Sequence, residues 1–426
     1  MKTYLTSLAL ALASTASAAG PYNAVVDAAG SGDYLTVSEA IAAVPDSLDS
    51  PWLILVKPGS YCEHVVVPAS KPNIHLIGTD PATTTIHYSM NIGKAPEQLP
   101  RYDKTSYWLY STNNPRSSRF GQGKAVVVVD APGFLSHGIS YVNDWGVGSS
   151  SGPQALAMYS NADRVSFSRC AFRSFQDTWR TADADSCRNF ARNCLIEGAV
   201  DYMYGGGDAF VDSCTFYNVR AGSVIVAPNH GTPEYGYVLN RCTIDGNNAS
   251  TDGHLKLGRP WKGNPKTVWL NTTALIPIAP EGWSDMGAIP AIFAEYNTMH
   301  RDGTPVDLSR RKSTFTARGT GETGSCPATL TAAEAARYTY DNVVKGADRW
   351  DPRAMTEELA SPRDIALSSG LLTWSPVEGA AGYMVYDGDD IIGLVTEPSF
   401  KLESPVKVSL KVRAVNPWGV PGNIGI

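Results

Sequence analysis

The sequence predicts an all-β protein in which a parallel β-helix is followed by a small β-sandwich. Two observations lead to this fold class. Short segments centred on a cysteine recur along the middle of the chain, and the pattern of strands and turns changes near residue 355. Repeats of ~20–30 residues built from short β-rich units are typical of solenoids, whereas helical repeats are longer and have a 3.6-residue period.

The repeated segments read VSFSRCAFRSFQD, NFARNCLIEGAVD, FVDSCTFYNVRA and YVLNRCTIDGNN. Their cysteines are Cys170, Cys194, Cys214 and Cys242, at steps of 24, 20 and 28 residues. Short alternating runs of apolar residues around each cysteine indicate β-strands. We expect the cysteines to stack as a ladder inside the solenoid. If one disulfide forms, Cys194 and Cys214 are the best-spaced pair.

Helices are predicted over 36–45 and 330–338. Each begins with the Thr-x-x-Glu spacing of a capping box, and a proline ends the first of them. The ends of a solenoid need to be covered. We therefore expect these two helices to close the two ends.

The N-terminus resembles an export signal. Lys2 precedes the apolar run 5–13, and Ala16-Ser17-Ala18 has the small residues of a cleavage site. The run is too short to span a bilayer. We expect residues 1–18 to be a signal peptide, the mature protein to be secreted or periplasmic, and no part of it to insert into a membrane.

The remaining chain is predicted to form two domains. Residues 19–350 contain the solenoid pattern, and residues 360–426 contain alternating strands, turn signals such as DGDD and a tryptophan in the first strand. This second pattern resembles a fibronectin-type-III-like β module. Its role as a spacer or as a binding domain for sugars or surfaces is open.

The net charge and the placement of the histidines argue against nucleic-acid binding and against a metal site. The net charge of −6 argues against a nucleic-acid binder, which usually has a basic surface. His137 and His230 are isolated, and no group of residues has metal-ligand spacing. We expect no metal, no cofactor and a monomeric protein.

The cysteine ladder has a consequence for two aspartates. Asp177 follows Cys170 by seven residues, and Asp201 follows Cys194 by seven residues. If the cysteines stack, the aspartates lie ~5 Å apart and titrate as a coupled pair, which is an arrangement that suits a nucleophile and a general acid. The alternative is structural, with Asp177 capping a turn and Asp201 accepting from backbone amides.

Five motifs occur together with these aspartates. They are GSYCE (59–63), QALAM (154–158), QDTW (176–179), DYMYG (201–205) and LGRPW (257–261). In this order they resemble the motifs of pectin methylesterases, and the resemblance extends over residues 22–345. It implies a right-handed parallel β-helix of the pectin-lyase-like type. It also implies that the partner is pectin or another methylated galacturonan polysaccharide.

The resemblance implies a role for each polar motif residue. Asp201 would be the nucleophile that attacks the C6 methyl ester of a galacturonate residue, and Asp177 would be the general acid and then the general base. Gln154 and Gln176 would donate hydrogen bonds to the oxyanion. Arg259 would bind Asp201, lower its pKa and keep it ionised.

Aromatic residues flank these motifs. We expect Trp261, Tyr204, Trp179 and Trp283 to contact the sugar rings, because aromatic faces suit the C–H faces of sugars. Trp179 and the tyrosines of DYMYG replace residues that are usual in the family. The stretch 95–122 is expected to be a long polar and aromatic insertion.

Two other functions fit a β-helix. A polysaccharide lyase would usually need a cluster of carboxylates for Ca²⁺, and a glycosidase would need two acids without the glutamines and the arginine. Neither pattern is visible in the sequence. A non-catalytic pectin-binding protein would bind the polymer without releasing methanol.

Overall fold

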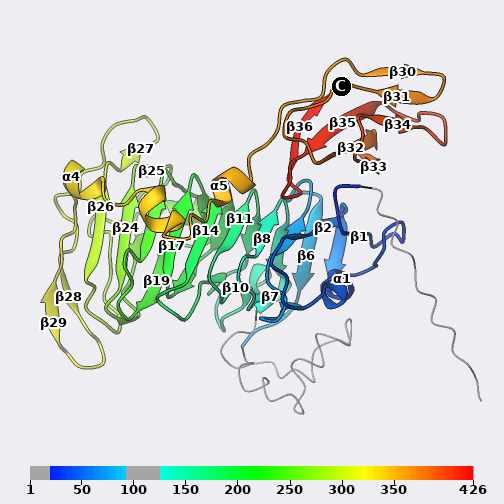
Figure 1. Ribbon diagram of the computed structural model, residues 1–426. Helices are drawn as coiled ribbons and strands as arrows, with labels where there is room; N and C mark the ends of the chain where they lie inside the picture. Colours follow the sequence, from blue (N-terminus) through cyan, green and yellow to red (C-terminus); the bar gives the residue numbers. More distant parts are fainter. Residues whose placement is uncertain (1–19, 93–124, 426) are drawn as a thin grey trace, which may run out of the picture.

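The computed structural model describes residues 20–92 and 125–425. Its larger part is a right-handed parallel β-helix, seen from the side in Figure 1, whose strands form three long sheets that we call A, B and C. Sheet A contains, in spatial order, β1 (Ala24–Val26), β2 (Trp52–Val56), β5 (Ile74–Ile77), β8 (Leu135–His137), β11 (Val165–Ser168), β14 (Arg188–Arg192), β17 (Asp208–Asp212), β20 (Tyr237–Asn240), β24 (Lys266–Leu270) and β26 (Ile292–Tyr296).

Sheets B and C run along the other two faces of the solenoid. Sheet B contains β3 (Gly59–Cys62), β6 (Thr84–Tyr88), β9 (Ser140–Asn143), β12 (Ala171–Arg173), β15 (Leu195–Gly198), β18 (Thr215–Asn218), β21 (Thr243–Gly246), β25 (Thr273–Ala274) and β27 (Met299–His300). Sheet C contains β4 (Val65–Val67), β7 (Ala125–Val129), β10 (Leu156–Ser160), β13 (Trp179–Arg180), β16 (Val200–Gly205), β19 (Val224–His230) and β22 (Lys256–Gly258), with β23 (Lys262–Gly263) also paired to β19.

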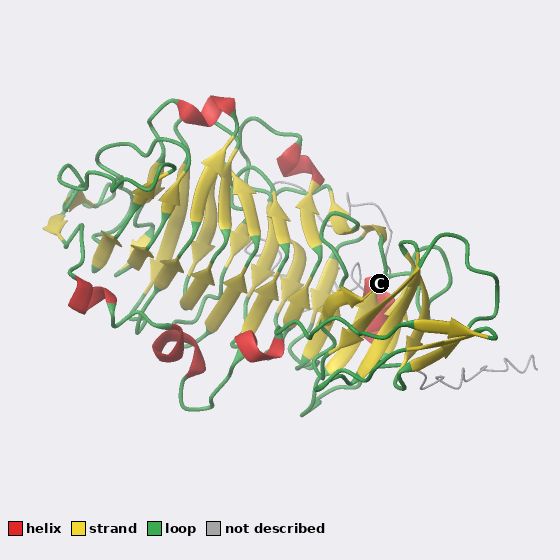
Figure 2. Cartoon of the chain, turned by 90° about the horizontal axis from the view of Figure 1, so that it is seen from above, coloured by secondary structure: helices red, strands yellow, loops and turns green. Residues whose placement is uncertain are grey.

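Each complete rung of the helix, such as β11–β12–β13, supplies one strand to each sheet, and the terminal rungs supply fewer. Neighbours in sheet A are three elements apart in the chain order for most of its length, as in β8, β11 and β14, and every pairing within the three sheets is parallel. Figure 2 shows the stacked strands from above. The predicted parallel β-helix is therefore confirmed.

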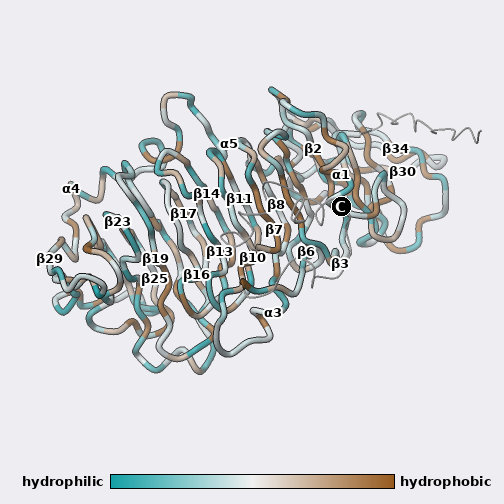
Figure 3. Tube along the Cα trace, turned by 90° about the horizontal axis from the view of Figure 1, so that it is seen from below, coloured by the Kyte–Doolittle hydropathy of each residue, from teal (hydrophilic) through white to brown (hydrophobic). Residues whose placement is uncertain are grey.

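The interior of the solenoid is apolar. In Figure 3 hydrophobic stretches follow strands such as β8 and β10, and hydrophilic stretches are concentrated in loops. The four ladder cysteines are buried in this core. Each of them follows a residue in the left-handed region, namely Arg169, Asn193, Ser213 and Arg241, with φ between 49° and 55°. This repeated backbone bend turns the chain from sheet A into sheet B and stacks the cysteines.

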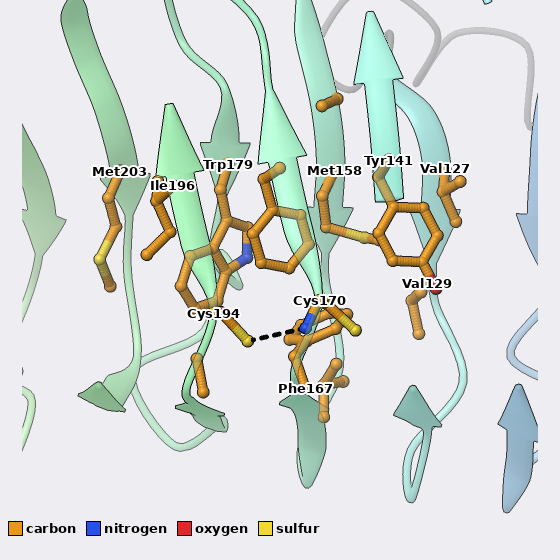
Figure 4. Packing of buried hydrophobic residues seen from close by; sticks show 14 of the residues in the cluster. Val127, Val129, Tyr141, Met158, Phe167, Cys170, Trp179, Cys194, Ile196 and Met203 are labelled. Atoms are coloured by element: carbon orange, nitrogen blue, oxygen red, sulfur yellow. Dashed lines mark hydrogen bonds between the residues drawn. The ribbon is translucent and has the colours of Figure 1, made fainter. Parts of the chain in front are cut away.

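The cysteines do not form the predicted disulfide. All the described cysteines, including Cys194 and Cys214, are free thiols. The Sγ atom of Cys194 accepts from the N–H of Cys170 at 3.4 Å, and Sγ of Cys214 accepts from the N–H of Cys194 at 3.3 Å (Figure 4). The sulfur atoms of Cys194 and Cys214 thus contact the backbone of the preceding rung, and neighbouring thiols of the ladder also hydrogen-bond to one another without a covalent bond. Burial raises the pKa of these thiols, which makes them unreactive.

The N-terminal end is closed as predicted. Helix α1 (Val37–Ala43) begins after Thr36, whose side chain accepts from the N–H of Glu39, and it buries Val37 and Ile41 against the core. At the other end the prediction is wrong. Helix α4 (Ala332–Ala335) has the expected capping box but buries none of its residues. The hairpin of β28 (Thr314–Thr316) and β29 (Thr323–Ser325) contributes buried Phe315 to the core instead.

Short helical elements decorate the outside of the solenoid. They are α3 (Asp144–Val147), the 3-10 turn η3 (Asn248–Thr251), the π-helical turn η4 (Asp341–Lys345) and α5 (Pro352–Met355). The last two belong to a segment that crosses the outer face of sheet A, where Tyr340 and Val344 pack with Phe190 and Phe210. This segment leads the chain back along the solenoid toward its N-terminal rungs (Figure 1).

The C-terminal part is a small antiparallel β-sandwich, as predicted. One sheet has three strands, β30 (Ala366–Ser368), β31 (Leu371–Thr373) and β34 (Ser399–Lys401). The other has four, β33 (Asp390–Val395), β32 (Gly382–Asp387), β35 (Leu410–Val415) and β36 (Pro421–Gly425). Its kinship to fibronectin type III remains a prediction.

The sandwich packs on the first rungs of the β-helix. Met384 and Val415 form one buried cluster with Leu55 of β2, and the hydroxyl of Tyr22 donates to the carbonyl of Gly419 at 2.8 Å. His75 of β5 adds a contact of 3.1 Å from its Nδ1 to the carbonyl of Trp418. The two ends of the described chain therefore meet.

Two predictions fall on residues outside the described ranges, namely the signal peptide 1–18 and the whole of the insertion 95–122. Within residues 20–92 and 125–425, no helix is long and apolar enough to cross a membrane.

Candidate active site

Asp177 and Asp201 occupy the same position in two neighbouring rungs. Trp179 pairs with Met203 and Arg180 with Tyr204, so the register offset is 24 residues and places Asp177 opposite Asp201. Adjacent parallel strands lie about 4.8 Å apart. The register that we inferred from the cysteines is confirmed.

Both aspartates lie in strained backbone. Asp177 has a φ of 64° and Asp201 a φ of 50°, in the left-handed region that non-glycine residues seldom occupy. The pairing of β16 with β19 is irregular between Val200 and Met203, directly at this bend. The bend turns the chain from sheet B into sheet C. Strained residues of this kind cluster at functional sites.

Arg259 binds one of the two aspartates. Its Nε donates to Oδ1 of Asp201 at 2.8 Å and its Nη2 donates to Oδ2 at 2.6 Å, a bidentate ion pair. Arg259 follows the end of β22 and reaches across β19 to Asp201. Its backbone N–H donates to the carbonyl of Val226 at 2.9 Å. A Cβ on the preceding Gly258 would lie 2.6 Å from Cγ2 of Val226, so this close approach requires glycine.

The electrostatics of the two carboxyl groups differ. Burial, and then the charge of Asp201, raise the pKa of Asp177 well above its usual range. Burial also raises the pKa of Asp201, while the hydrogen bonds and charge of Arg259 lower it. Arg259 lowers the pKa of Asp201 as expected, but burial has the larger effect, so the pKa of Asp201 is raised overall. Of the two carboxyl groups, Asp177 has the more strongly raised pKa, and Asp201 is the one that carries the ion pair.

Gln154 and Gln176 lie beside the pair. Gln176 directly precedes Asp177, and its carbonyl accepts from the N–H of Ala155 at 3.0 Å, which places Gln154 at the same bend one rung earlier. Both side chains are half-buried. A Cβ on Gly152 would lie 2.9 Å from Oε1 of Gln176, so the 148–153 loop passes close to this amide. Donation by the two amides to an oxyanion remains a prediction.

Tyr204 and Trp261 form an aromatic wall on the outer face of sheet C. Their ring centroids are 5.7 Å apart with planes inclined by 60°. They pack with Tyr159 and Leu156 in a cluster outside the solenoid core. The Tyr204 hydroxyl hydrogen-bonds to Asp177. Trp261 is half-buried and presents the remaining part of its ring to the outside.

Trp179 and Trp283 do not reach this wall, and the prediction that they contact substrate is wrong. Both are fully buried. Trp179 stacks on Phe172 at 5.3 Å, and its Nε1 donates to Oγ of Ser160 at 2.9 Å inside the core (Figure 4). Trp283 packs on Phe293 with centroids 4.7 Å apart. In the short strand β13 Trp179 faces inward, so its neighbour Arg180 faces outward.

Arg180 is a site residue that sequence reasoning missed. Its guanidinium lies over the Tyr159 ring at 4.6 Å and over the Tyr204 ring at 5.8 Å. Nη2 of Arg180 donates to Oδ1 of Asp183 at 2.6 Å. Its positive charge acts on Asp177 and lowers the pKa of that carboxyl. The register predicted from the cysteines places Arg180 opposite Tyr204 on the next rung, and this pairing would have identified Arg180 as a site residue.

No metal site accompanies this pair in the described chain, where no three His, Cys, Asp or Glu side chains gather in a way that could hold an ion. The site therefore consists of two coupled carboxyl groups, the two arginines Arg259 and Arg180, and two flanking amides beside an aromatic wall. Such a set can perform nucleophilic and acid–base chemistry on an ester.

Comparison with known proteins supports this interpretation. A family model described as Pectinesterase matches residues 23–99 and 112–346. A carrot pectinesterase is 31% identical over 271 residues, covering 61% of this chain and 76% of the relative. Pectinesterase 1 of Arabidopsis thaliana is 29% identical over 334 residues, covering 76% of this chain and 50% of that protein, so the chain spans about half of its length.

A solved structure is similar as well. The pectin methylesterase from carrot aligns with a TM-score of 0.60 and 26% identity, over 77% of this chain and 94% of the carrot chain.

Proposed function

This chain belongs to the pectinesterase family, and we propose that it hydrolyses the C6 methyl esters of galacturonate residues in pectin, with release of methanol. The observation that carries the mechanism is the asymmetry of the aspartate pair. Arg259 binds Asp201 through both carboxylate oxygens, while the pKa of Asp177 is raised well above its usual range.

In the first half of the reaction Asp201 is the nucleophile. One of its oxygens attacks the ester carbonyl carbon, and the developing oxyanion accepts from the side-chain amides of Gln154 and Gln176. The bond to the methoxy oxygen breaks, and Asp177 gives its proton to the departing methanol. An acyl-enzyme on Asp201 and an ionised Asp177 remain.

In the second half Asp177 is the base. It takes a proton from water, whose oxygen attacks the acyl-enzyme, and Asp201 leaves as a carboxylate. The product is a galacturonic acid residue, which releases its proton to solvent and becomes a carboxylate, and Asp177 is protonated again. Arg259 stabilises the negative charge of Asp201 at the start and at the end of the cycle.

The polymer is proposed to lie along the outer face of sheet C. Half-buried Trp261 offers an aromatic face beside the aspartates, with the buried ring of Tyr204 packed against it. Sugar C–H faces pack well on such rings. In the same proposal the catalytic β-helix spans residues 19–350, and the fibronectin-type-III-like module spans 360–426. Export by the signal peptide 1–18 would bring the enzyme to extracellular pectin.

The proposal is tested by methanol release from highly methylated pectin. We expect release by the unmodified protein and none by Asp201→Ala. Asp245→Ala is the matched control, because this aspartate lies on sheet B and its carboxylate only accepts from the N–H of Gly246. Pectin binding without methanol release by the unmodified protein would instead identify a non-catalytic pectin-binding protein.

A further inference from the structure

A hydrogen-bonded serine, histidine and aspartate lie on the outer face of sheet B. Oγ of Ser60 is 2.9 Å from Nε2 of His87, and Nδ1 of His87 is 2.6 Å from Oδ2 of Asp144. These are the contacts that join the serine, histidine and aspartate of serine hydrolases, in the same order. The strand order β3-β6-β9-β12 places Ser60 three rungs before the rung of Asp177.

The strands fix this arrangement. Ser60 pairs with Thr85 and Cys62 with His87, so His87 lies diagonally across from Ser60 on the neighbouring strand. Tyr61 and Ile86 point into the core. Because side chains alternate along a strand, Ser60 and His87 both point outward. Asp144 begins α3, whose N-cap is Asn143.

The proton positions follow from the partners. A carboxylate only accepts, so Nδ1 of His87 carries the proton that is shared with Asp144. In the neutral imidazole Nε2 then has a lone pair, and the Ser60 hydroxyl donates to it. This is the tautomer that a general base needs in order to take a proton from serine.

A donor for an oxyanion is present at the same place. β3 is an edge strand of sheet B in the described chain, so it pairs with β6 on one side and with no strand on the other. The N–H groups of Gly59 and Glu63 donate to Thr83 and His87 across the paired edge, at 2.9 and 3.0 Å. N–H groups alternate between the two edges of a strand. The N–H of Ser60 therefore points to the open edge, and the nucleophile's own N–H also serves the oxyanion in serine proteases.

The group is accessible. Ser60 is exposed, and the side chains of His87 and Asp144 are 23% and 41% exposed. The neighbouring outward-facing residues on the two strands are Cys62 and Thr85. These small side chains leave no deep apolar pocket for a long aliphatic chain.

We propose that Ser60, His87 and Asp144 form a second acyl-transfer site, independent of the aspartate pair, that hydrolyses esters with a short acyl group. Ser60 Oγ bonds to the ester carbonyl carbon as its proton passes to His87 Nε2. The ester C–O bond breaks, and the alcohol leaves with that proton. Water then attacks the acyl-serine and gives its proton to His87, and the carboxylic acid and the original serine are released.

The first test uses a fluorophosphonate probe, which phosphonylates an activated serine with loss of fluoride, followed by peptide mapping of the full chain. We expect the label on Ser60, with a labelling rate that falls about 100-fold in His87→Gln because the general base is lost. Cys62→Ala is the matched control, since Cys62 lies on the same strand and faces His87 in register. This control should label at the unmodified rate.

The second test measures hydrolysis of 4-nitrophenyl acetate in the Asp201→Ala background, so that the aspartate site contributes nothing. We expect adding Ser60→Ala to this background to reduce turnover about 100-fold. An exposed serine is dispensable for folding, and an unchanged melting temperature confirms this. Absence of label at Ser60, or labelling that His87→Gln leaves unchanged, overturns the proposal. So does turnover that is equal with and without Ser60.

Discussion

Arg259 donates one hydrogen bond to each carboxylate oxygen of Asp201, at 2.8 and 2.6 Å, while its effect on Asp177 is that of a nearby charge alone. Two stacked aspartates with equal surroundings would share their proton equally. The planar fork of the guanidinium breaks this symmetry, because it satisfies only the carboxylate in its plane. In the proposed mechanism, the roles of nucleophile and acid are thereby assigned by a residue that follows Asp201 by 58 positions.

The first prediction concerns this fork. Arg259→Lys keeps the charge but loses the bidentate geometry, and we expect kcat for methanol release to fall about 100-fold or more. Arg241→Lys is the control, since Arg241 binds Asp212 through the same kind of fork but is 56% exposed and far from the site. Near-normal turnover by Arg259→Lys would show that charge alone is sufficient.

The second prediction concerns the pH profile. The proposed mechanism needs Asp201 ionised and Asp177 protonated, so we expect turnover to fall at high pH as Asp177 loses its proton. The hydroxyl of Tyr204 lowers the pKa of Asp177 by hydrogen-bonding to it. Tyr204→Phe removes this bond, and we expect the alkaline limb of kcat to move to higher pH. A limb that stays in place would mean that another group controls it.

The third prediction links Asp177 to stability. Its folded-state pKa is raised above the ordinary value of 3.8. The folded state then binds the proton more tightly than the unfolded state, so stability falls as the pH rises from about 4 toward the folded-state pKa. Asp177→Asn has no titrating carboxyl group at this position, so it does not lose this stability as the pH rises. We expect the variant to gain in melting temperature relative to the unmodified protein at pH 7, and to gain less at pH 3.5.

The fourth prediction compares two tryptophans. Trp261→Ala should raise KM with a small effect on kcat and on stability, because the ring lies at the aromatic wall outside the core. Trp179→Ala should instead lower the unfolding free energy by about 3–5 kcal/mol, because its ring is fully buried among aromatic residues. Methanol-release kinetics and denaturant unfolding of both variants separate the two roles.

The fifth prediction concerns the ion pair of Glu295 and Arg311 near the C-terminal end of the solenoid, whose side chains are 0% and 1% exposed. Arg311→Met leaves a buried carboxylate without its cation, and we expect a loss of about 3–5 kcal/mol in unfolding free energy. The double variant Glu295→Leu with Arg311→Met should recover much of it. Lys345→Met, which removes the more exposed ion pairs with Asp341 and Asp351, should lower the unfolding free energy far less.

The sequence predicted the solenoid and its central pair because both follow from the spacing of the cysteines. Counting seven residues from Cys170 and Cys194 placed Asp177 beside Asp201, and the strand register agrees. The same counting could not tell which way Trp179 faces, because β13 has only two residues and carries no alternation of its own. Arg180, which faces outward, was overlooked for the same reason.

Other features depend on contacts that local patterns do not encode. The capping box at Thr331 formed as predicted, but its helix lies outside the core because Phe315 already occupies that place. Cys194 and Cys214 are free thiols whose sulfur atoms accept hydrogen bonds from backbone N–H groups. The spacing of the cysteines alone does not distinguish this arrangement from a disulfide. The docking of the sandwich on β2 involves residues more than 300 positions apart.

That docking has a consequence for the order of synthesis. In an open solenoid each rung needs only its neighbours, so rungs can fold as they are made. Here Leu55 and Ile77 of the first rungs are covered by Met384, Val415 and Val420, which are made last. A newly made chain therefore carries a complete aspartate site and an uncovered apolar face until its final strands arrive. A protein truncated before the sandwich would keep the aspartate site and expose an apolar surface prone to aggregation.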